Sequence, residues 1–525
     1  MNVETLAWLA VAVVTIATRW INLDGNPLQP SESALAMDSL RILRGLGVTI
    51  APSPFLVYGN VLVFLTLGAT DATARALPAL SGTLVALSPL LLRRHIGRLG
   101  SLAAALILAM SPTLIFGARS VEPTALSLAL GLGILVAAIG YKSTGRTSCA
   151  YVAGILVPPL LISGPAAVTL VIIMVAYVAI SLWSRPTPAI TTARSAESIP
   201  TAAVENDWQL RALLAELSPA TLRRIGLVAI VEYAILATGL GTNLQGLGDS
   251  IAQPLAIWAG AVGSINSQSI GLVPLIFFGY EPLILGFGVA GAIRAFRLAR
   301  PLDQFLAWCA AAAILIVIVG DGLYPLWIEL AIAPLGILAG HAVEDLWTAF
   351  TTSEQRRRLL VYAAVALPLL ATTIIAASNA TVIDPAVPRL AFLAPFLAIV
   401  FFSLGIGIYY DARTALTSAA AVVFLASCGI TVHAAMMLNS GGMLNPADVF
   451  VDTATSSDVR TMTKQVTTIL GELRIARQLE AKPVIETVSI VSTFANPIEW
   501  YLRDFPQARV VSSVGDSPAI AIVGA

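Results

Sequence analysis

The chain has 525 residues, of which 57% are hydrophobic and only 11% charged, and its mean hydropathy is +0.85. Soluble domains carry about 25% charged residues, so this composition excludes an ordinary soluble protein and indicates an integral membrane protein. The formal net charge is zero, and no basic stretch interleaved with aromatic residues suggests nucleic-acid binding. We therefore expect membrane lipids, and no nucleic acid, among the partners.

Apolar segments that can cross a bilayer recur along residues 1–440 and predict an all-α polytopic membrane domain of about thirteen transmembrane helices. They run over 4–20, 72–92, 100–117, 123–141, 150–163, 165–183, 224–240, 270–293, 303–320, 324–346, 358–377, 389–409 and 414–437. The first has no basic n-region or cleavage site, so we expect it to be retained, with Arg19 and Trp20 as an interfacial anchor. The shorter segment 55–68 predicts a re-entrant or membrane-surface helix.

Basic residues favour a plasma-membrane protein with a cytoplasmic N-terminus and its C-terminal domain outside. In that orientation the cytoplasmic loops carry Arg93, Arg94, Arg98, Lys142, Arg146, Arg185, Arg194, Arg211, Arg223, Arg224, Arg294, Arg297, Arg300, Arg356, Arg357, Arg358 and Arg413. The short outer loops carry only Arg19, Arg41, Arg44, Arg75, Arg119 and Arg389. A long first loop, 21–71, then lies outside, and a linker, 184–222, lies inside with leucines at helical spacing over 210–217.

Residues 445–525 predict a small extracytoplasmic α/β domain. A strand is expected at Val449–Val451, a helix over 457–480 capped by Ser457, and strands near 484–491, 509–512 and 519–523. The pair Asn496-Pro497 is expected to open a short helix. No glycine-rich phosphate loop marks this domain as a nucleotide site.

Two acidic residues are candidates for chemistry at the outer face, Glu32 and Glu122. Glycosyl transfer there needs a carboxylate that accepts a hydroxyl proton or binds a metal ion, and cations that hold a lipid phosphate. Arg75 and Arg119 are outer-face cations that can do this. Purely structural roles are open as well: Ser31 can cap a helix that starts at Glu32, and the acids complement helix dipoles.

Three acids lie within or beside later spans, Glu281, Asp321 and Glu329, where ionisable groups usually face a cavity or a partner. We expect Asp321 to reach the cavity of the outer site. Each histidine is isolated and each cysteine lies in an apolar run, so neither a zinc site nor a disulfide framework is indicated.

Several motifs of the first 140 residues resemble those of the GT-C superfamily of polytopic glycosyltransferases, family 39, of the protein O-mannosyltransferase and aminoarabinose-transferase type. They are the Arg19-Trp20 exit from the first span, the acid Glu32, the Pro-Phe-Leu-x-Tyr helix at 54–58, and the stretches GATDATARALPALSG, LLLRRHIGRLGSLAAALILAMSP and FGARSVEP. The tail motifs VDTATSSDVRTM and NPIEWYLRDF are similar to those of an archaeal-type branch associated with flipping of lipid-linked glycans.

The resemblance implies a polyprenyl-phosphate sugar donor and transfer to a glycan or protein acceptor at the extracytoplasmic face. Glu32 would be the base or a ligand of a divalent metal ion, Glu122 a second acid and Arg119 a phosphate contact. Asp24, Arg75 and Asp321 are further candidates for substrate binding. The family's Asp-Glu pair falls on Ser31-Glu32, so only Glu32 carries over. This loss keeps open a non-catalytic protein that binds or helps translocate lipid-linked glycans.

Overall fold

The structure is a computed structural model, and most of the chain can be described. The described ranges are 2–46, 53–183, 218–263, 267–320, 325–349, 360–372, 412–440, 448–451, 453–479, 488–491, 495–505, 508–511 and 520–522, with a few single residues between 357 and 409. The predicted linker helix at 210–217, the span 389–409 and Asp321 lie outside these ranges.

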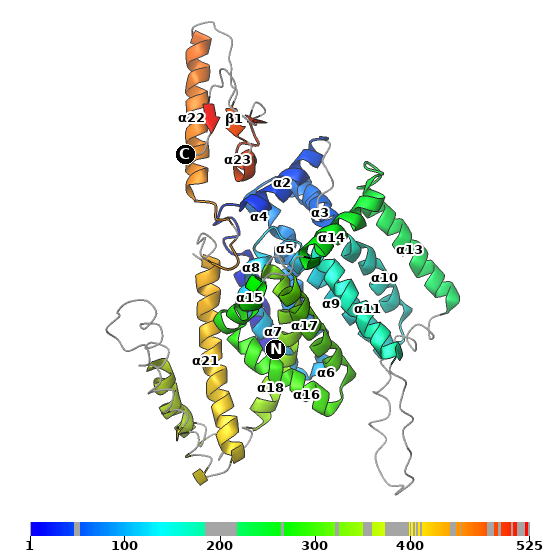
Figure 1. Cartoon of the computed structure of the whole chain (residues 1–525), viewed down its shortest axis with the longest axis vertical. Helices are drawn as coiled ribbons and strands as arrows, with labels where there is room; N and C mark the ends of the chain where they lie inside the picture. The colour runs from blue at the N-terminus through cyan, green and yellow to red at the C-terminus, as the bar shows by residue number, and fades with distance from the viewer. Residues whose placement is uncertain are drawn as a thin grey trace.

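Short helices and longer apolar ones alternate in the first half of the chain. The elements are α1 Val3–Trp20, α2 Pro30–Leu43, α3 Pro54–Leu67, α4 Asp71–Ala74, α5 Ala76–Leu87, η1 Ser88–Leu90, α6 Arg93–Ile96, α7 Arg98–Met110, α8 Pro112–Ala118, α9 Thr124–Thr144, α10 Thr147–Leu161 and α11 Pro165–Trp183. Helix α3 corresponds to the predicted surface helix. Because α2, α3 and α4 gather at one end of the bundle, they build a folded loop there (Figure 1).

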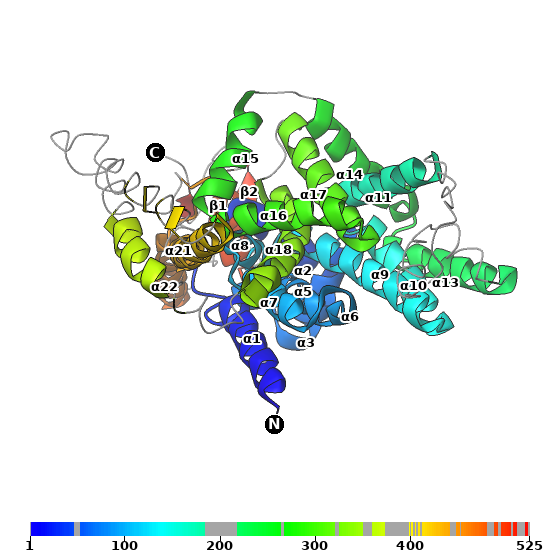
Figure 2. The same ribbon diagram turned by 90° about the horizontal axis from the view of Figure 1, so that it is seen from below.

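The second half of the chain completes the helical bundle. Its elements are α13 Pro219–Ala237, α14 Gly246–Gly263, α15 Ser267–Gly279, α16 Pro282–Leu298, α17 Pro301–Val319, η2 Pro325–Ile328, α18 Glu329–Ala349 and α21 Ala412–Ser440. Helix α14 was not among the predicted spans, because Asp249, Gln253 and Pro254 interrupt its apolar pattern. Seen from below, α1 projects from the bundle, with the N-terminus at its free end (Figure 2).

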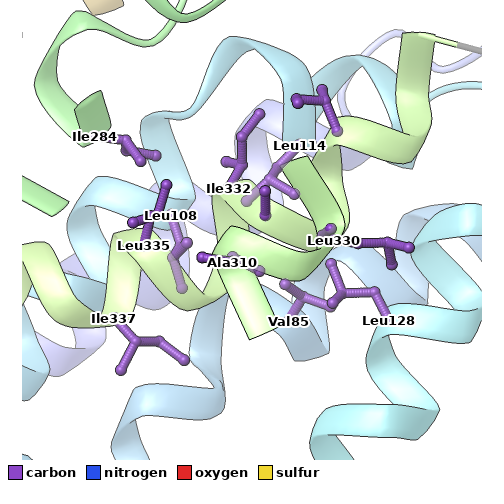
Figure 3. Close-up of a cluster of buried hydrophobic side chains, with 14 of the residues drawn as sticks. Val85, Leu108, Leu114, Leu128, Ile284, Ala310, Leu330, Ile332, Leu335 and Ile337 are labelled. Atoms are coloured by element: carbon purple, nitrogen blue, oxygen red, sulfur yellow. The ribbon is translucent and has the colours of Figure 1, made fainter. Parts of the chain in front are cut away.

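Helix α18 is the centre of the bundle. Every residue from Glu329 to His341 is buried, so the helix is covered on all sides. Its apolar side chains meet those of α5, α7, α8, α9, α16 and α17, and Figure 3 shows this cluster around Leu330, Ile332 and Leu335. Glycines bring backbones close here: a methyl group on Gly340 would overlap the carbonyl of Gly100 in α7.

Two predicted spans are broken helices. The segment 100–117 bends by 62° between α7 and α8, and 270–293 bends by 102° between α15 and α16. In the described residues, five helices are long and apolar enough to cross a membrane, or up to seven if each bent pair is one span. The exact number of spans, the domain boundaries and the orientation stay predictions.

Buried polar side chains hold the first of these breaks together. Arg19 donates hydrogen bonds to the carbonyls of Leu108 (3.0 Å) and Ala109 (3.1 Å), and Glu281 accepts the backbone N–H of Thr113 (3.0 Å). Non-helical backbone that is buried inside a membrane protein needs such partners, because no solvent reaches it to form the hydrogen bonds. The predicted role of Arg19 as an interfacial anchor is therefore wrong: its side chain is fully buried.

The C-terminal elements form a parallel sheet beside two helices. Strand β1 Val488–Val491 lies between β2 Ala508–Val511 and β3 Ile520–Ile522, with Val488 opposite Ala508 and Ile520. The helices are α22 Asp458–Leu479 and α23 Ala495–Tyr501. Figure 1 shows these elements above the first loop, with α23 over α2.

Two local predictions for the tail are wrong. Val449–Val451 is a turn, because Asp448 accepts the N–H of Phe450 (3.0 Å) and the Phe450 ring packs between Phe116 and Tyr280. The second concerns the cap of α22, which was predicted to be Ser457. The hydroxyl that accepts the N–H of Asp458 belongs to Ser456, one residue earlier.

Candidate functional site

Glu32 lies in a buried ion pair with Arg75. Arg75 Nε donates to Glu32 Oε1 (3.1 Å) and Arg75 Nη2 donates to Glu32 Oε2 (2.7 Å), and both side chains are almost fully buried. The sequence places Glu32 here through a capping box: helix α2 starts at Pro30, with Gln29 as N-cap and Glu32 at the third position. The expected cap, Ser31, is wrong by two residues, because Pro30 already occupies the first helical turn.

The hydrogen bonds of Glu32 leave its carboxylate saturated. Besides Arg75, it accepts the backbone N–H groups of Gln29 (2.8 Å) and Val121 (2.7 Å). Two carboxylate oxygens offer about four lone-pair sites, and all four are used. Proton abstraction or metal binding by Glu32 would therefore require this network to open.

Arg75 is saturated in the same way. Its remaining N–H groups donate to the carbonyls of Leu23 (3.0 Å), Asn26 (2.8 Å) and Pro27 (3.2 Å). A guanidinium has five N–H donors, so none is left for a phosphate in this conformation. The residue fixes the fold of loop 21–29.

Asp71, at the start of α4, holds the C-terminal elements against the first loop. It accepts hydrogen bonds from Trp500 Nε1 (2.7 Å), Tyr501 Oη (2.9 Å) and Arg460 Nη2 (2.6 Å). Trp500 is fully buried, and Tyr501 also accepts the N–H of Leu28. We call this set, Asp71 with Arg460, Trp500 and Tyr501, the Asp71 junction.

Further contacts lie beside the Asp71 junction. Arg41 of α2 pairs with Glu499 of α23 (2.6 Å), and Arg44 donates to the carbonyl of Arg503 (2.9 Å). Arg503 in turn stacks over the Trp500 ring, 4.4 Å from its centroid. The two tail motifs singled out in the sequence therefore meet at one acid of the first loop.

Glu122 follows Val121, whose backbone N–H donates a hydrogen bond to Glu32. It is only partly exposed, and Thr124 Oγ1 donates to its Oε1 (3.1 Å). Burial raises the pKa of Glu122 to about 7, with the Glu32 charge adding to the rise and the Thr124 hydrogen bond opposing it. A partly accessible carboxylate with a pKa near neutrality has the properties of a general base.

Unlike Arg75, Arg119 has a side-chain N–H group without a hydrogen-bond partner among the described residues. Its Nη1 donates to the carbonyls of Thr18 (3.2 Å) and Ile21 (2.8 Å), and its Nη2 to that of Asn22 (2.9 Å), at the end of α1. Nε has no partner in the described part of the chain. Burial and the nearby Arg75 charge lower the pKa of Arg119. The Nε–H group stays unused while the other donors of Arg119 hold the end of α1.

Two acids of the later spans, Glu329 and Glu281, lie close to α7 and α8, the helices that precede Arg119. Glu329 is fully buried and both its oxygens lack a hydrogen-bond partner among the described residues. A methyl group on Gly117 of α8 would overlap this carboxylate, so Glu329 packs against α8. Gly117 lies two residues before Arg119 in the sequence. Glu281 is also buried, and accepts from Ser111 Oγ (2.5 Å) as well as from Thr113.

The structure thus brings Glu32, Arg75, Arg119 and Glu122 together, and leaves Asp24 at the edge. Asp24 is exposed, and its carbonyl accepts a hydrogen bond from Arg460 (2.6 Å). No group of three or more His, Cys, Asp or Glu side chains that could hold a metal ion occurs among the described residues. Asp71 was missed as a site residue, because it lies only four residues before Arg75, a spacing typical of an ordinary helix pair. The aromatic and basic residues of the tail motifs were the signal that could have found it.

Comparisons with known proteins identify the fold. The crystal structure of ArnT from Cupriavidus metallidurans in the apo state overlaps 95% of this chain and 84% of that one, with 15% identity and a TM-score of 0.56. ArnT bound to undecaprenyl phosphate gives 17% identity and a TM-score of 0.58 over the same shares. The Archaeoglobus fulgidus oligosaccharyltransferase, also in the apo form, overlaps 96% of this chain and 64% of that one, with 13% identity and a TM-score of 0.46.

At these identities the likeness to ArnT shows the fold alone. The protein is a polytopic helical membrane protein with a GT-C fold, which confirms the fold class predicted from the sequence. The archaeal-type branch stays a prediction. No protein-family model matches the sequence, and no curated protein matches it.

Proposed function

We propose that this protein is a glycosyltransferase that moves a sugar from a polyprenyl-phosphate donor at the membrane face that carries the first loop and the C-terminal domain. The observation that carries the proposal is that one turn carries two suitable groups: Glu122 is a partly exposed carboxylate, and Arg119, three residues earlier, is a cation with an unused N–H group. Undecaprenyl phosphate bound to ArnT supports a lipid-phosphate ligand on this fold.

In this proposal Glu122, deprotonated, accepts the proton of the attacking acceptor hydroxyl. Arg119 donates N–H groups to the phosphate that leaves with the lipid and gains negative charge. Glu32 acts as a positioning residue, because its hydrogen bond to Val121 N–H fixes the turn that carries Glu122. The sequence-based hypothesis of Glu32 as the base is thereby replaced by one in which Glu32 supports the base.

The test uses purified full-length protein supplied with a polyprenyl-phosphate sugar and a glycan or peptide acceptor. We expect Glu122→Gln to lower the rate of sugar transfer by about 10²–10⁴-fold, and Glu472→Gln to leave it unchanged, since Glu472 is exposed on α22. Unchanged transfer by the Glu122 variant would contradict the assignment.

One observation favours a second function, binding or translocation of lipid-linked glycan without transfer. The acid at the family's motif position, Glu32, and its neighbour Arg75 are both saturated by structural hydrogen bonds. This alternative predicts that the wild-type protein binds the lipid-linked sugar but produces no transferred sugar with any acceptor, and observed transfer excludes it.

A further inference from the structure

A cavity of about 620 Å³ lies at the end of the bundle opposite the first loop. It is a wedge between the corner η1–α6–α7 and the last turns of α9. In Figures 1 and 2, α6 lies beside α7 and α9, away from the C-terminal elements. Its volume falls within the range of small-molecule sites.

The corner side of the cavity is cationic. Arg93, Arg94, His95 and Arg98 line it, and no Asp or Glu does. Arg93 pairs with Glu4 of α1, whereas Arg94 and Arg98 are exposed and their side chains have no ion pair or hydrogen bond within the described ranges. Besides Glu4, which pairs with Arg93, the acid Glu344 lies close by, with its carboxylate against Gly97 and Gly100 beside the cavity. The charge balance favours an anion.

Part of the lining is apolar. Leu90 and Leu91 of the corner are exposed, and Val136 and Ile139 line the α9 side before Gly140, Ser143 and Thr144. A free inorganic anion would gain nothing from the apolar residues, but a molecule with an anionic head and a hydrocarbon chain would contact both the arginines and these side chains. The position at the ends of membrane helices gives such a molecule access from the bilayer.

We propose that this cavity binds the headgroup of an anionic phospholipid, with Arg94 and Arg98 donating to the phosphate and the upper acyl chain lying along Val136 and Ile139. The site is distinct from the proposed transfer site and does not depend on it. Two exposed arginines at a membrane surface contribute about 1 kcal/mol each, so together they account for about a 30-fold change in affinity.

The experiment compares lipid binding by the purified full-length protein in neutral detergent, using native mass spectrometry with phosphatidylglycerol, phosphatidylcholine and inorganic phosphate. The variant is Arg94→Gln with Arg98→Gln. The control is Arg223→Gln with Arg224→Gln, an exposed arginine pair at the start of α13 that does not line the cavity.

We expect wild-type protein and the control to bind phosphatidylglycerol in preference to phosphatidylcholine, and the Arg94/Arg98 variant to bind it about 30-fold more weakly. Both variants should keep the thermal unfolding temperature of lipid-free protein, since all four side chains are exposed. Three results would overturn the proposal: equal binding of the two lipids, an equal loss in the control pair, or full displacement of the lipid by inorganic phosphate.

Discussion

Glu32 and Arg75 form a two-point ion pair that closes a chain of contacts from the C-terminal domain to the turn of Glu122. Arg460, Trp500 and Tyr501 bind Asp71 at the start of α4, and Arg75 follows the last residue of the same short helix. Arg75 binds Glu32, and Glu32 binds the N–H of Val121. Helices α22 and α23, the first loop and the candidate base are therefore joined by one polar network.

The Glu32–Arg75 pair should be important for stability. Removing one partner of a buried pair leaves an uncompensated charge and costs about 3–5 kcal/mol, so Glu32→Gln should lower the thermal unfolding temperature clearly. Arg294→Gln is the control, because its pair with Asp345 is partly exposed and worth at most about 1 kcal/mol. Equal effects of the two substitutions would contradict a structural role for Glu32.

Sugar transfer should depend on the protonation of Glu122. Since its pKa is raised to about 7, the carboxyl group is protonated below that pH and cannot act as a base. The transfer rate should rise as the pH passes through about 7, and Glu122→Gln should lower it by about 10²–10⁴-fold and remove this step. A wild-type profile that is flat between pH 5 and pH 9, on the order of two units either side of this pKa, would exclude the assignment.

The same raised pKa has an opposite effect on stability. A carboxyl group with a folded-state pKa above its ordinary value of 4.5 favours the folded protein in its protonated form. This contribution is fully present below about pH 4.5 and is lost as the pH rises through about 7. Comparison of wild-type and Glu122→Gln unfolding temperatures at pH 5 and pH 8 should show the difference, on the order of a few degrees at most.

Substitution of Asp71 should release the C-terminal domain. Asp71→Ala removes the acceptor of three hydrogen bonds and leaves Arg460 without its carboxylate, which weakens docking by about 2–5 kcal/mol. Limited proteolysis should then cut faster between α21 and α22. Asp504→Asn is the matched control: Asp504 pairs with Arg44 at 3.8 Å and its side chain is 80% exposed, so no change is expected. Unchanged proteolysis of Asp71→Ala would show that other contacts suffice.

Close approach of α7 and α18 should make Gly340 intolerant of a side chain. A methyl group there overlaps the Gly100 carbonyl, so Gly340→Ala should separate the helices and destabilise the bundle by about 1–3 kcal/mol. Gly429 lies in α21 with open space around it, so Gly429→Ala should be neutral or stabilising by up to about 1 kcal/mol. Thermal unfolding in one detergent compares the two variants, and equal destabilisation would argue against close packing at Gly340.

The sequence by itself determined the membrane class, most helix positions and the fold class. Long apolar runs can be satisfied only by helices in lipid, so composition and length sufficed for α1, α9, α17 and α18. Motif resemblance pointed to the GT-C fold, and residue types together with the resemblance gave Glu32, Glu122, Arg75, Arg119, Asp24 and Asp321 as candidates. The structure brings the first four together and leaves Asp24 at the edge, whereas Asp321 lies outside the described residues.

Only the tertiary structure decided what each of these residues does. Glu32 and Arg75 have the residue types of a catalytic acid and a phosphate-binding cation, but their hydrogen bonds come from Val121 and from loop carbonyls that no local pattern reveals. The breaks at Ser111 and Glu281 were hidden for the same reason, since both segments are apolar enough for one continuous span. Asp71 became a junction only when residues about four hundred positions away folded onto it. Long-range pairing of polar groups is set by packing, and a single sequence records residue types without recording their partners.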